Sequence, residues 1–291
     1  MTFNLSCKWR DWNPSEECWK QCLNILGNKE EVDRIMAFKR PSPTVKGAWV
    51  TGKDNDSAKA SMCGRLLMLW VASKTFSKPP SHFTFKRDAN EKPFIVGYDN
   101  STKENTIHFN VSHDGDYTII TSSNDTSIQS IGIDIMKNQP PKGQSIEEFF
   151  KTMKSCFTEF EWNNIKSQTT ESKRLEHFYR HWCLKESYIK ADGIGLQLGL
   201  QTMEFTLDDD FKTATLKLHA KPTPNPCQFI LANIDDHFVA YCIMTSKTAV
   251  TDQQQQQQQH YQLHLNNIQT ITPLDLCQRL EEMNNQQQQQ Q

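Results

Sequence analysis

Helical and alternating patterns follow one another in the same order in both halves of this chain, and this order restricts the fold more than any other feature. In the first half, a helical pattern over 58–76 precedes short stretches in which apolar and polar residues alternate. In the second half, helical patterns within 145–191 precede further alternating stretches. Helices combined with runs of short strands in this way are typical of an α+β protein. We therefore predict an α+β fold with two similar subdomains, 1–125 and 126–247.

The spacing of apolar and turn residues defines the individual elements. Apolar residues within 62–70 recur at three- and four-residue steps, as on one face of a helix. The stretches 107–112 and 117–122 alternate on either side of Asp114-Gly115, a strong signal for a hairpin turn. The other predicted helices are 145–155, 157–167 and 175–191, and the other predicted strands are 130–136, 201–207, 214–219, 228–234 and 238–245.

Low-complexity sequence fills the last part of the chain, with uninterrupted glutamine runs over 253–259 and 286–291. Such sequence offers too little apolar surface to offset chain entropy. We expect 248–291 to be a largely disordered Gln-rich tail with at most a short helix over 274–283. The Gly- and Pro-rich stretch 41–56 is predicted to be a surface loop.

Charge and hydropathy exclude several classes of protein. The formal net charge is -2, which gives no reason to expect a nucleic-acid partner. The longest apolar runs, 66–72 and 238–244, are far shorter than the roughly 20 residues of a membrane-spanning helix. The first residues do not combine a basic segment with an apolar one, so no secretory signal is expected. The predicted compartment is the cytosol.

Cysteine usage agrees with a reducing compartment. There are nine cysteines, an odd number, and none forms a CxxC pair, so reduced thiols are expected. The pairs Cys18/Cys22 and His177/His181 are the nearest to metal-ligand spacing, but neither has a second pair at a recognisable distance. We do not predict a structural zinc ion.

The segment SIGIDIM is the most informative short stretch. On a strand, Ile131, Ile133 and Ile135 point to one face, whereas Gly132 and Asp134 point to the other. The isoleucines are predicted core. The glycine permits a ligand or a second backbone to approach closely beside Asp134. Taken alone, the pattern favours an exposed strand aspartate beside a packing glycine, with ligand binding as the alternative.

The segment HWCLKESYIK places charged groups along one side of a predicted helix. Trp182, Glu186 and Lys190 are successive i, i+4 neighbours. Such a carboxylate and ammonium can serve metal binding, proton transfer and phosphate contact, but an ordinary surface ion pair gives the same pattern and is favoured when the segment is taken alone. Ser112 and His113 lie at a strand end just before the predicted turn, where a structural role is again favoured.

Together these segments change the interpretation. FNVSHDGDY, IGIDIM and WCLKESYIKADGIG closely resemble the 4'-phosphopantetheinyl transferase superfamily, in particular its two-unit, surfactin-synthetase-activator type and the animal members linked to aminoadipate-semialdehyde dehydrogenase. The resemblance covers most of 57–205, including AKASMCGRLLM and KRDANEKPFI. Its most specific part is W-x-x-K-E-[SA]-x-x-K after an upstream Gly-Ile-Asp, formed here by Trp182, Lys185, Glu186, Ser187 and Lys190.

The resemblance implies an enzyme that transfers the phosphopantetheine arm of coenzyme A to a serine of an acyl or peptidyl carrier protein, releasing adenosine 3',5'-bisphosphate. Asp134 and Glu186 match the family's Mg²⁺ ligands. Glu186 is also the implied general base, and Lys190 the group that neutralises the pyrophosphate and protonates the leaving bisphosphate. A two-unit chain builds this site at the junction of its halves, so a monomer is expected.

The same resemblance assigns the coenzyme A contacts. Ser112 and His113 match a Ser-His pair whose histidine contacts the 3'-phosphate, and Arg87 and Lys92 lie where the family has basic residues around a Lys-Pro pair. Arg65 is a further basic candidate, with pairing on its own helix as the alternative. The implied coenzyme A residues are Arg87, Lys92, Asn110, Ser112, His113, Asp134, Glu186 and Lys190.

Two departures from the family pattern affect the expected site. Met136 stands where many members have a third acidic metal ligand, and its thioether is too soft for Mg²⁺. A water held by Asp114 is the predicted replacement. Near an insertion within 41–57, the family's phosphate-binding arginine before the AKA helix has no direct match, and Arg40 and Lys53 are both candidates to replace it.

The implied partners are carrier domains of the fatty-acid synthase, polyketide synthase and aminoadipate reductase types. Carrier domains are acidic around the modified serine, so a basic docking surface near Lys185, with Lys173, Arg174 and Arg180, is one prediction, and solvated helix residues are the alternative. Two other functions remain as alternatives. One is a non-catalytic coenzyme A-binding or partner-docking module, and the other a metal-dependent phosphohydrolase.

Overall fold

The computed structural model describes residues 1–193, 199–219, 226–245 and 267–288. The chain divides into two compact units, Met1–Thr126 with Gln269–Gln291, and Ser127–Ile268. The predicted boundary between 125 and 126 lies one residue from this division. Among the described helices, none is both long enough and apolar enough to cross a lipid bilayer.

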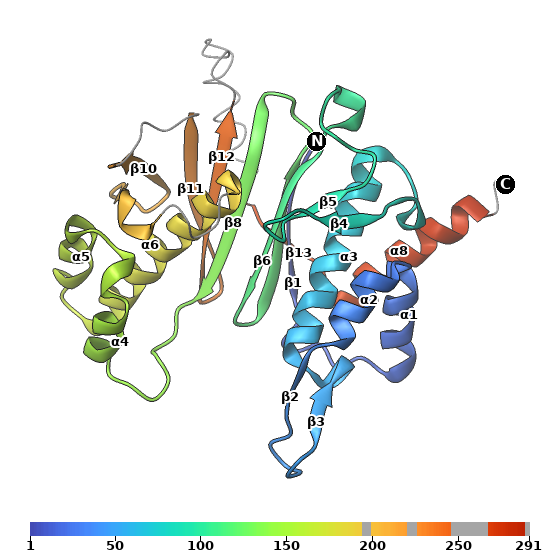
Figure 1. Cartoon of the computed structure of the whole chain (residues 1–291), viewed down its shortest axis with the longest axis horizontal. Coiled ribbons are helices and arrows are strands. Elements are labelled where there is room, and N and C mark those ends of the chain that lie inside the picture. The colour runs from blue at the N-terminus through green and yellow to red at the C-terminus, as the bar shows by residue number, and fades with distance from the viewer. Residues whose placement is uncertain (194–198, 220–225, 246–266, 289–291) are drawn as a thin grey trace. The chain divides into compact units, whose positions relative to one another are not determined.

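The first unit is built on a four-stranded sheet with the order β13-β1-β7-β6 (Figure 1). Strand β1 pairs antiparallel with β7 and parallel with β13. The predicted hairpin is present, but Asp114 pairs with Tyr117, so the two-residue turn is Gly115-Asp116, one residue later than predicted. Gly115 has a φ of +57°, which glycine adopts without strain. The strands are β1 Thr2–Lys8, β6 His108–Asp114, β7 Tyr117–Ser123 and β13 Gln269–Thr270.

Helix α3, Asp56–Phe76, is the long helix predicted from apolar spacing, and it packs on this sheet. Its first turn is capped by Asn55, whose side chain accepts a hydrogen bond from the backbone N–H of Ala58. Leu66 and Leu67 are fully buried. Around α3 lie α1 Glu16–Leu26, α2 Lys29–Met36 and α8 Pro273–Gln288, together with the short 3₁₀ helices η2 Pro80–His82 and η3 Lys103–Asn105.

Two small hairpins complete the first unit. One consists of β4 Phe85–Arg87 and β5 Pro93–Ile95, in the region where short extended stretches are expected. The other consists of β2 Lys39–Pro41 and β3 Trp49–Thr51, followed by η1 Gly52–Asp54. The stretch predicted as a surface loop is therefore exposed, as expected, but it contains an ordered hairpin.

The end of the chain differs from the predicted disordered tail over Gln269–Gln288. Strand β13 and helix α8 belong to the first unit, and Leu276, Cys277 and Leu280 of α8 are buried. These residues form an apolar face that the glutamine content of the region conceals. Helix α8 includes the predicted short helix and is longer. The run 253–259 and the last residues, 289–291, lie outside the described residues.

The second unit is an antiparallel five-stranded sheet with the order β8-β12-β11-β10-β9. Helix α6, Glu171–Asp192, crosses β8 and β12 (Figure 1), beginning at the Thr170 cap and ending at Gly193 with a φ of +77°. The other helices are α4 Ile146–Thr152, η4 Lys154–Cys156, α5 Glu159–Lys166 and η6 Leu200–Thr202. The strands are β8 Ile128–Lys137, β9 Met203–Leu207, β10 Thr213–Leu218, β11 Cys227–Ile234 and β12 His237–Thr245.

Aromatic side chains fill the core between α6 and its neighbouring helices. The Phe150 and Phe178 rings stack with centroids 5.5 Å apart, and Phe157 meets Phe178 edge-on at 5.1 Å. Such pairs add about 0.5–1.5 kcal/mol each beyond the burial of their surface. This core holds α6 rigidly, and α6 carries the functional residues predicted for this unit.

Candidate active site

Gly132 of β8 explains how the strand and helix of the second unit meet. A Cβ atom at this position would lie 1.9 Å from the backbone O of Ser187 and 2.6 Å from the backbone N of Ala191, both on α6. Only glycine permits this approach. Of the two predicted roles of the glycine, to admit a ligand or a second backbone, the structure shows the second, and the second backbone is α6. The exposed position favoured for Asp134 is wrong, because the aspartate is buried beside this helix.

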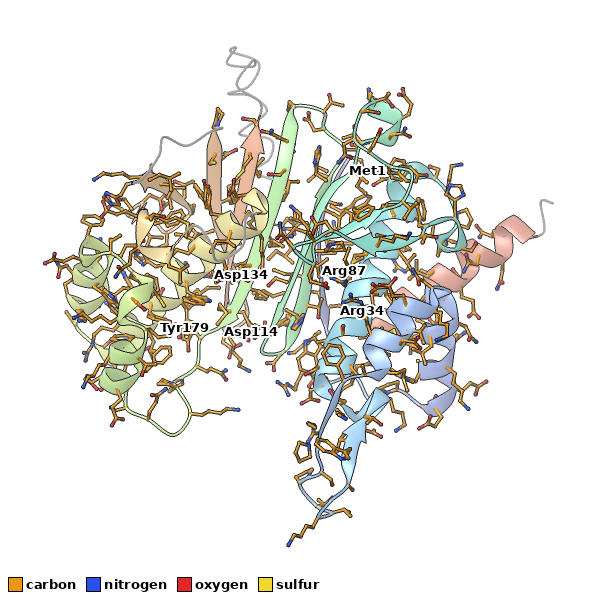
Figure 2. The ribbon with its side chains drawn as sticks, viewed as in Figure 1. Met1, Arg34, Arg87, Asp114, Asp134 and Tyr179 are labelled. Atoms are coloured by element: carbon orange, nitrogen blue, oxygen red, sulfur yellow. The ribbon has the colours of Figure 1, made fainter. Side chains whose placement is uncertain are left out.

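This close packing brings three predicted site residues together. Asp134 lies two residues after Gly132 on the same face of β8 (Figure 2), and the Nζ of Lys190 lies 2.6 Å from its Oδ1. Glu186 lies one turn before Lys190 on α6. Burial raises the pKa of Glu186, the negative charge of Asp134 raises it further, and Lys190 opposes both. The site therefore contains two carboxylates, of which Glu186 has a raised pKa, and one ammonium, which contacts Asp134.

The donor chemistry of this group suits a hard divalent cation. Asp134 and Glu186 offer carboxylate oxygens, the ligands that Mg²⁺ takes alongside waters and phosphate oxygens. A cation between them would relieve the repulsion that raises the pKa of Glu186. Met136, on the same face of β8, packs against the apolar core of the second unit and offers no such oxygen.

Lys185 is not a surface cation, so it cannot contribute to the docking surface predicted near its helix. Its side chain and that of Glu161 on α5 are both fully buried, with Nζ 2.8 Å from Glu161 Oε2. The Nζ also donates hydrogen bonds to the backbone O of Leu200 at 2.8 Å and of Met203 at 2.6 Å. All three ammonium protons are thus used, and Lys185 ties α5 and β9 to α6.

The other cations of that predicted surface differ in their exposure to solvent. Arg180 is buried and pairs with Glu176 at 2.9 Å, so it cannot contribute either. Arg174 is partly exposed and lies 3.4 Å from Glu147, and Lys173 is exposed. The exposed cations therefore lie near the start of α6, because the helix is buried on most of its circumference after its first turn.

In the first unit, Arg87 contacts the turn of its own hairpin and a carboxylate of α2. Its Nη1 donates to the backbone O of Glu91 at 2.8 Å, and its Nε lies 3.5 Å from Glu31 Oε1. Glu31 also contacts Arg65 Nε at 2.5 Å, so the ion pair of Arg65 is with α2 and not with its own helix. On its own helix, Arg65 Nη1 donates a hydrogen bond to the backbone O of Ser61 at 3.1 Å. Figure 2 labels Arg87 with Arg34, which pairs with Glu91 at 2.9 Å. The buried Glu31 is a residue that sequence reasoning missed.

The remaining predicted coenzyme A residues of this unit lie on or beside β6. Asn110 and Ser112 share one face of the strand, and His113 follows on the other. Burial lowers the pKa of His108 to about 4, and the charge of Lys92, in the β4–β5 turn, contributes. Lys92 therefore lies near the start of β6, so the first unit gathers these residues around one strand.

The two sets of residues belong to different units. Asp134, Glu186 and Lys190 lie in the second, whereas Arg87 and the β6 residues lie in the first. That they form one site stays a prediction, and so does the water-holding role of Asp114. Within each unit, the predicted residues of that set nevertheless lie on the same or neighbouring elements.

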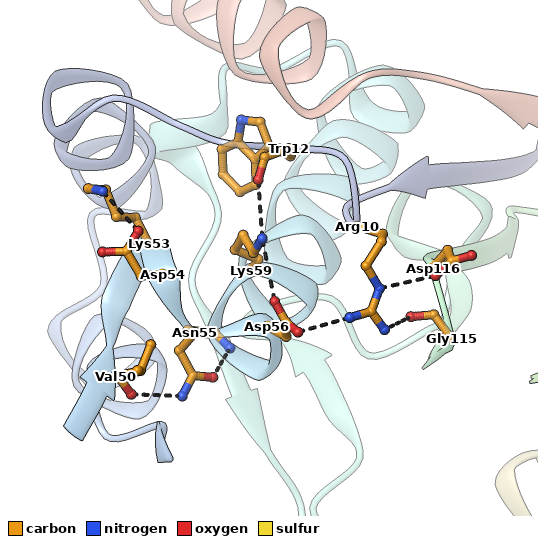
Figure 3. A network of polar contacts seen from close by, with 11 residues as sticks. Arg10, Trp12, Val50, Lys53, Asp54, Asn55, Asp56, Lys59, Gly115 and Asp116 are labelled. Carbon is orange, nitrogen blue, oxygen red and sulfur yellow. Dashed lines mark hydrogen bonds and ion pairs between the residues drawn. The ribbon is translucent and has the colours of Figure 1, made fainter. Parts of the chain in front are cut away.

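Sequence reasoning also missed Arg10, which fixes the β6–β7 turn to the start of α3 (Figure 3). Its guanidinium donates to Asp56 at 2.9 Å, to Asp116 at 3.1 Å and to the backbone O of Gly115 at 2.9 Å. The turn after His113 is thereby held at a defined position. A lone arginine near the chain start carries no sequence signal for this role.

The two candidates for the missing phosphate-binding arginine also differ. Lys53 pairs with Asp54 at 2.9 Å and lies 3.8 Å from Glu16, so its charge is already offset. Arg40 is exposed on β2 and forms no ion pair with another described residue. The structure therefore favours Arg40 as the available cation.

Comparisons with known proteins identify the family. The family model described as "4'-phosphopantetheinyl transferase, N-terminal" matches residues 10–125, and that of the "4'-phosphopantetheinyl transferase superfamily" matches residues 130–242. The first match falls in the first unit and the second in the second, and together they cover most of the chain. The chain belongs to the 4'-phosphopantetheinyl transferase superfamily.

Individual relatives are similar over much of the chain. The L-aminoadipate-semialdehyde dehydrogenase-phosphopantetheinyl transferase of Xenopus laevis is 41% identical over 67% of this chain and 58% of its own length. The chain therefore spans less than two thirds of that relative. The 4'-phosphopantetheinyl transferase Sfp of Bacillus subtilis is 26% identical over 74% of this chain and 86% of its own.

A solved structure of a holo-(acyl-carrier-protein) synthase from Bacillus anthracis, in complex with CoA (3',5'-ADP), is also similar. It is 25% identical, covers 41% of this chain and 98% of its own, and has a TM-score of 0.34.

Proposed function

We propose that this protein transfers the 4'-phosphopantetheine group of coenzyme A to a serine of acyl or peptidyl carrier proteins, with Mg²⁺ as cofactor. The serine oxygen attacks the phosphorus that bears the pantetheine arm. The bond from that phosphorus to the bridging oxygen breaks, and adenosine 3',5'-bisphosphate leaves. The observation that carries the proposal is the contact of Gly132 with α6, which places Asp134, Glu186 and Lys190 together in a chain of this family.

Glu186 is the proposed base for the serine hydroxyl. A general base is most effective when its pKa lies closer to the working pH than that of an ordinary glutamate. Burial and the charge of Asp134 raise the pKa of Glu186 in that direction. A partly buried carboxylate on a rigid helix can thus take the serine proton as the new P–O bond forms.

Lys190 is the proposed acid and electrostatic partner. Its ammonium would offset the charge on the pyrophosphate and give a proton to the leaving bisphosphate. The contact of 2.6 Å with Asp134 holds the Nζ in place. Asp134 therefore has a positioning role toward Lys190 besides its proposed role as a ligand.

Asp134 and Glu186 would hold the Mg²⁺ ion, since they are the two carboxylates of the second unit that share this face of β8 and α6. When bound, the ion would supply charge neutralisation at the phosphate oxygens. For coenzyme A we propose Arg87, Lys92, Asn110, Ser112 and His113 as the contacts from the first unit.

The proposed acceptors are carrier domains of fatty-acid synthase, polyketide synthase and aminoadipate reductase type. The similarity to a relative named for L-aminoadipate-semialdehyde dehydrogenase supports the last of these and a link to lysine metabolism. We further propose that the protein acts as a monomer, because both halves of the proposed site are encoded in one chain. Its proposed compartment is the cytosol.

The test is the intact mass of an apo acyl carrier protein after incubation with this protein, coenzyme A and Mg²⁺. We expect a gain of one phosphopantetheine on the carrier serine, absent with chelator and reduced about 100-fold or more in rate for Glu186→Gln. Adenosine 3',5'-bisphosphate should appear in equal amount. No gain with several unrelated carriers would contradict the proposal, as would release of free phosphopantetheine.

A further inference from the structure

The β2–β3 hairpin exposes an unusual amount of apolar surface for its size. We call residues 36–51 the basic hairpin. Four large apolar side chains in this stretch are exposed, Met36 at 45%, Phe38 at 37%, Val45 at 57% and Trp49 at 58%. Clustered exposed apolar side chains surrounded by polar ones mark interaction sites, whereas single ones need no explanation.

One face of the hairpin combines an aromatic ring with a cation. Pro41 pairs with Trp49 and Lys39 with Thr51, so these four side chains share a face of the ribbon. The Nζ of Lys39 lies 5.3 Å from the Trp49 ring centroid, a cation–π contact. The tryptophan is thus held in one orientation while it faces solvent.

The charge of the basic hairpin is of one sign. It contains Lys39, Arg40 and Lys46 and no acidic residue, although the whole chain has a formal net charge of -2. Positive charge is therefore concentrated on a small ribbon with an exposed tryptophan. Tryptophan and arginine are enriched at protein interfaces, and the lysines add charge that can steer an acidic partner.

The hairpin is ordered without a core of its own. Its loop is closed by hydrogen bonds from Ser42 N to Ala48 O at 2.8 Å and from Ala48 N to Val45 O at 3.2 Å. At its base, Asn55 Nδ2 donates to Val50 O at 3.1 Å (Figure 3). The same Asn55 caps α3, which joins the ribbon to the longest helix of the unit. An isolated two-stranded ribbon is only marginally stable in water, so an ordered one with exposed apolar residues is suited to be covered by a partner.

We propose that the basic hairpin is a docking element for the acidic face of the apo carrier protein. The inference rests on the proposed function, which requires a protein acceptor, and adds the surface that recognises it. Trp49 and Val45 would contact apolar side chains of the carrier, and Lys39 and Lys46 would face its carboxylates. The complementary charge concerns the encounter and the orientation of the carrier rather than the transfer step.

A protein surface fits this hairpin better than an anionic membrane. Clusters that bind anionic lipid have about four to eight lysines and arginines, each contributing about 1 kcal/mol. The basic hairpin has three cations. Three cations, of which Lys39 contacts the exposed Trp49 ring, match the scale of a small protein contact.

The experiment separates recognition of the carrier from recognition of coenzyme A. Trp49→Ala and Lys39→Glu/Lys46→Glu are compared with wild type for the KM of an apo acyl carrier protein and the KM of coenzyme A. Arg40 is left unchanged, because it is a candidate phosphate contact. The controls are Phe160→Ala, an aromatic side chain 42% exposed on α5, and Lys78→Glu/Lys103→Glu, two exposed lysines of the same unit.

We expect the hairpin variants to raise the KM of the carrier about fivefold or more and to leave the KM of coenzyme A within about twofold, because a rim charge acts mainly on association. The charge-reversal variant should also lose most of the salt dependence of the carrier KM. The controls should match wild type. Carrier KM values equal to those of the controls would overturn the proposal.

Direct binding distinguishes this proposal from the proposed function. Apo carrier protein is titrated into the protein without coenzyme A or Mg²⁺ by calorimetry. Binding that is lost in Lys39→Glu/Lys46→Glu supports docking even if no transfer occurs, and binding that is unchanged refutes docking even if transfer occurs. Absence of binding to wild type would also refute it. So would a hairpin-dependent dimer in gel filtration, or hairpin-dependent sedimentation with phosphatidylserine vesicles in place of carrier binding.

Discussion

Lys185 and Lys190 lie five residues apart on α6, and each contacts a carboxylate, but their surroundings differ. Lys185 is fully buried and bonded to Glu161 and two backbone carbonyls. Lys190 is 27% exposed, contacts Asp134, and has a second carboxylate, Glu186, one turn away. The first arrangement satisfies every donor of the ammonium, whereas the second places unbalanced charge where solvent or a substrate can reach it.

The difference shows how one helix supports both structure and chemistry. A buried ion pair with complete hydrogen bonding fixes the position of its helix, and removing either partner leaves a costly buried charge. Perturbed pKa values at partly exposed positions are characteristic of functional sites. The stretch around Lys185 holds α6 rigid, and the same rigidity positions Glu186, the next residue, and Lys190, one turn after Glu186.

The largest expected effect comes from breaking the structural pair. Lys185→Met should lower the free energy of unfolding by about 3–5 kcal/mol, because Glu161 is left buried without its counter-charge. Denaturant titration measures the change. Lys212→Met, which removes an exposed pair with Asp210, is the control and should change stability by no more than about 1 kcal/mol.

Removing both partners sharpens this test. Glu161→Gln/Lys185→Met should recover part of the loss, since no buried charge remains. A double variant no more stable than the single one would show that the hydrogen bonds of Lys185 to Leu200 and Met203, rather than the charge pair, hold α6.

Gly132→Ala should lower the free energy of unfolding by about 3 kcal/mol, because the added Cβ would overlap α6. It should also abolish transfer by separating Asp134 from Lys190. Gly64→Ala on α3 is the matched control. Its Cβ would meet Val111 at 3.4 Å, an ordinary contact, and the higher helix propensity of alanine should stabilise the protein by up to about 1 kcal/mol. Equal effects of the two substitutions would refute the close-packing argument.

The charges around Glu186 predict opposite shifts of its titration in the metal-free protein. Asp134 raises the pKa of Glu186 and Lys190 opposes it. Asp134→Asn should therefore lower the pKa and Lys190→Met should raise it further, both measured by NMR of side-chain-labelled glutamate. In metal-free wild type, Glu186 should lose its proton at a higher pH than an ordinary glutamate, whose pKa is about 4.3. Shifts of the same sign in both variants would contradict this arrangement.

The smallest effect is a gain in stability from losing the base. The pKa of Glu186 is higher in the folded metal-free protein than in an ordinary glutamate. The folded state therefore loses stability as the pH rises from the pKa of an ordinary glutamate to the pKa of Glu186 in the folded protein. Glu186→Gln should therefore unfold with a free energy about 1 kcal/mol higher at neutral pH. The difference should vanish at acidic pH, where the glutamate is protonated in both states. A variant less stable than wild type at neutral pH would contradict it.

Local periodicity was sufficient to predict much of the fold. Apolar spacing gave α3 and α6, and alternation gave the β6–β7 hairpin and β8, because each of these elements is regular and contributes apolar side chains to a core. The turn was misplaced by one residue since Asp114-Gly115 and Gly115-Asp116 both suit a tight turn. The side of β8 that carries Asp134 also followed from alternation alone.

Residues whose role depends on a distant partner were not predictable in the same way. Lys185 looked like a surface cation because Glu161 lies on another helix, and Arg65 gave no sign of its partner Glu31. Helix α8 was hidden by the glutamine content around it, although Leu276 and Leu280 are one turn apart. These contacts join segments far apart in sequence, which periodicity does not report.

The return of the C-terminal segment to the first unit has a consequence for folding during synthesis. Strand β13 pairs with β1 at Leu5 and Gln269, so a stretch that leaves the ribosome before the second unit pairs with one that leaves it after that unit. A ribosome adds about 5–20 residues per second, from the N-terminus onward. We expect the second unit, whose residues emerge without interruption, to complete its folding first. Leu5 and its neighbours would meanwhile present an open strand edge until β13 and α8 arrive.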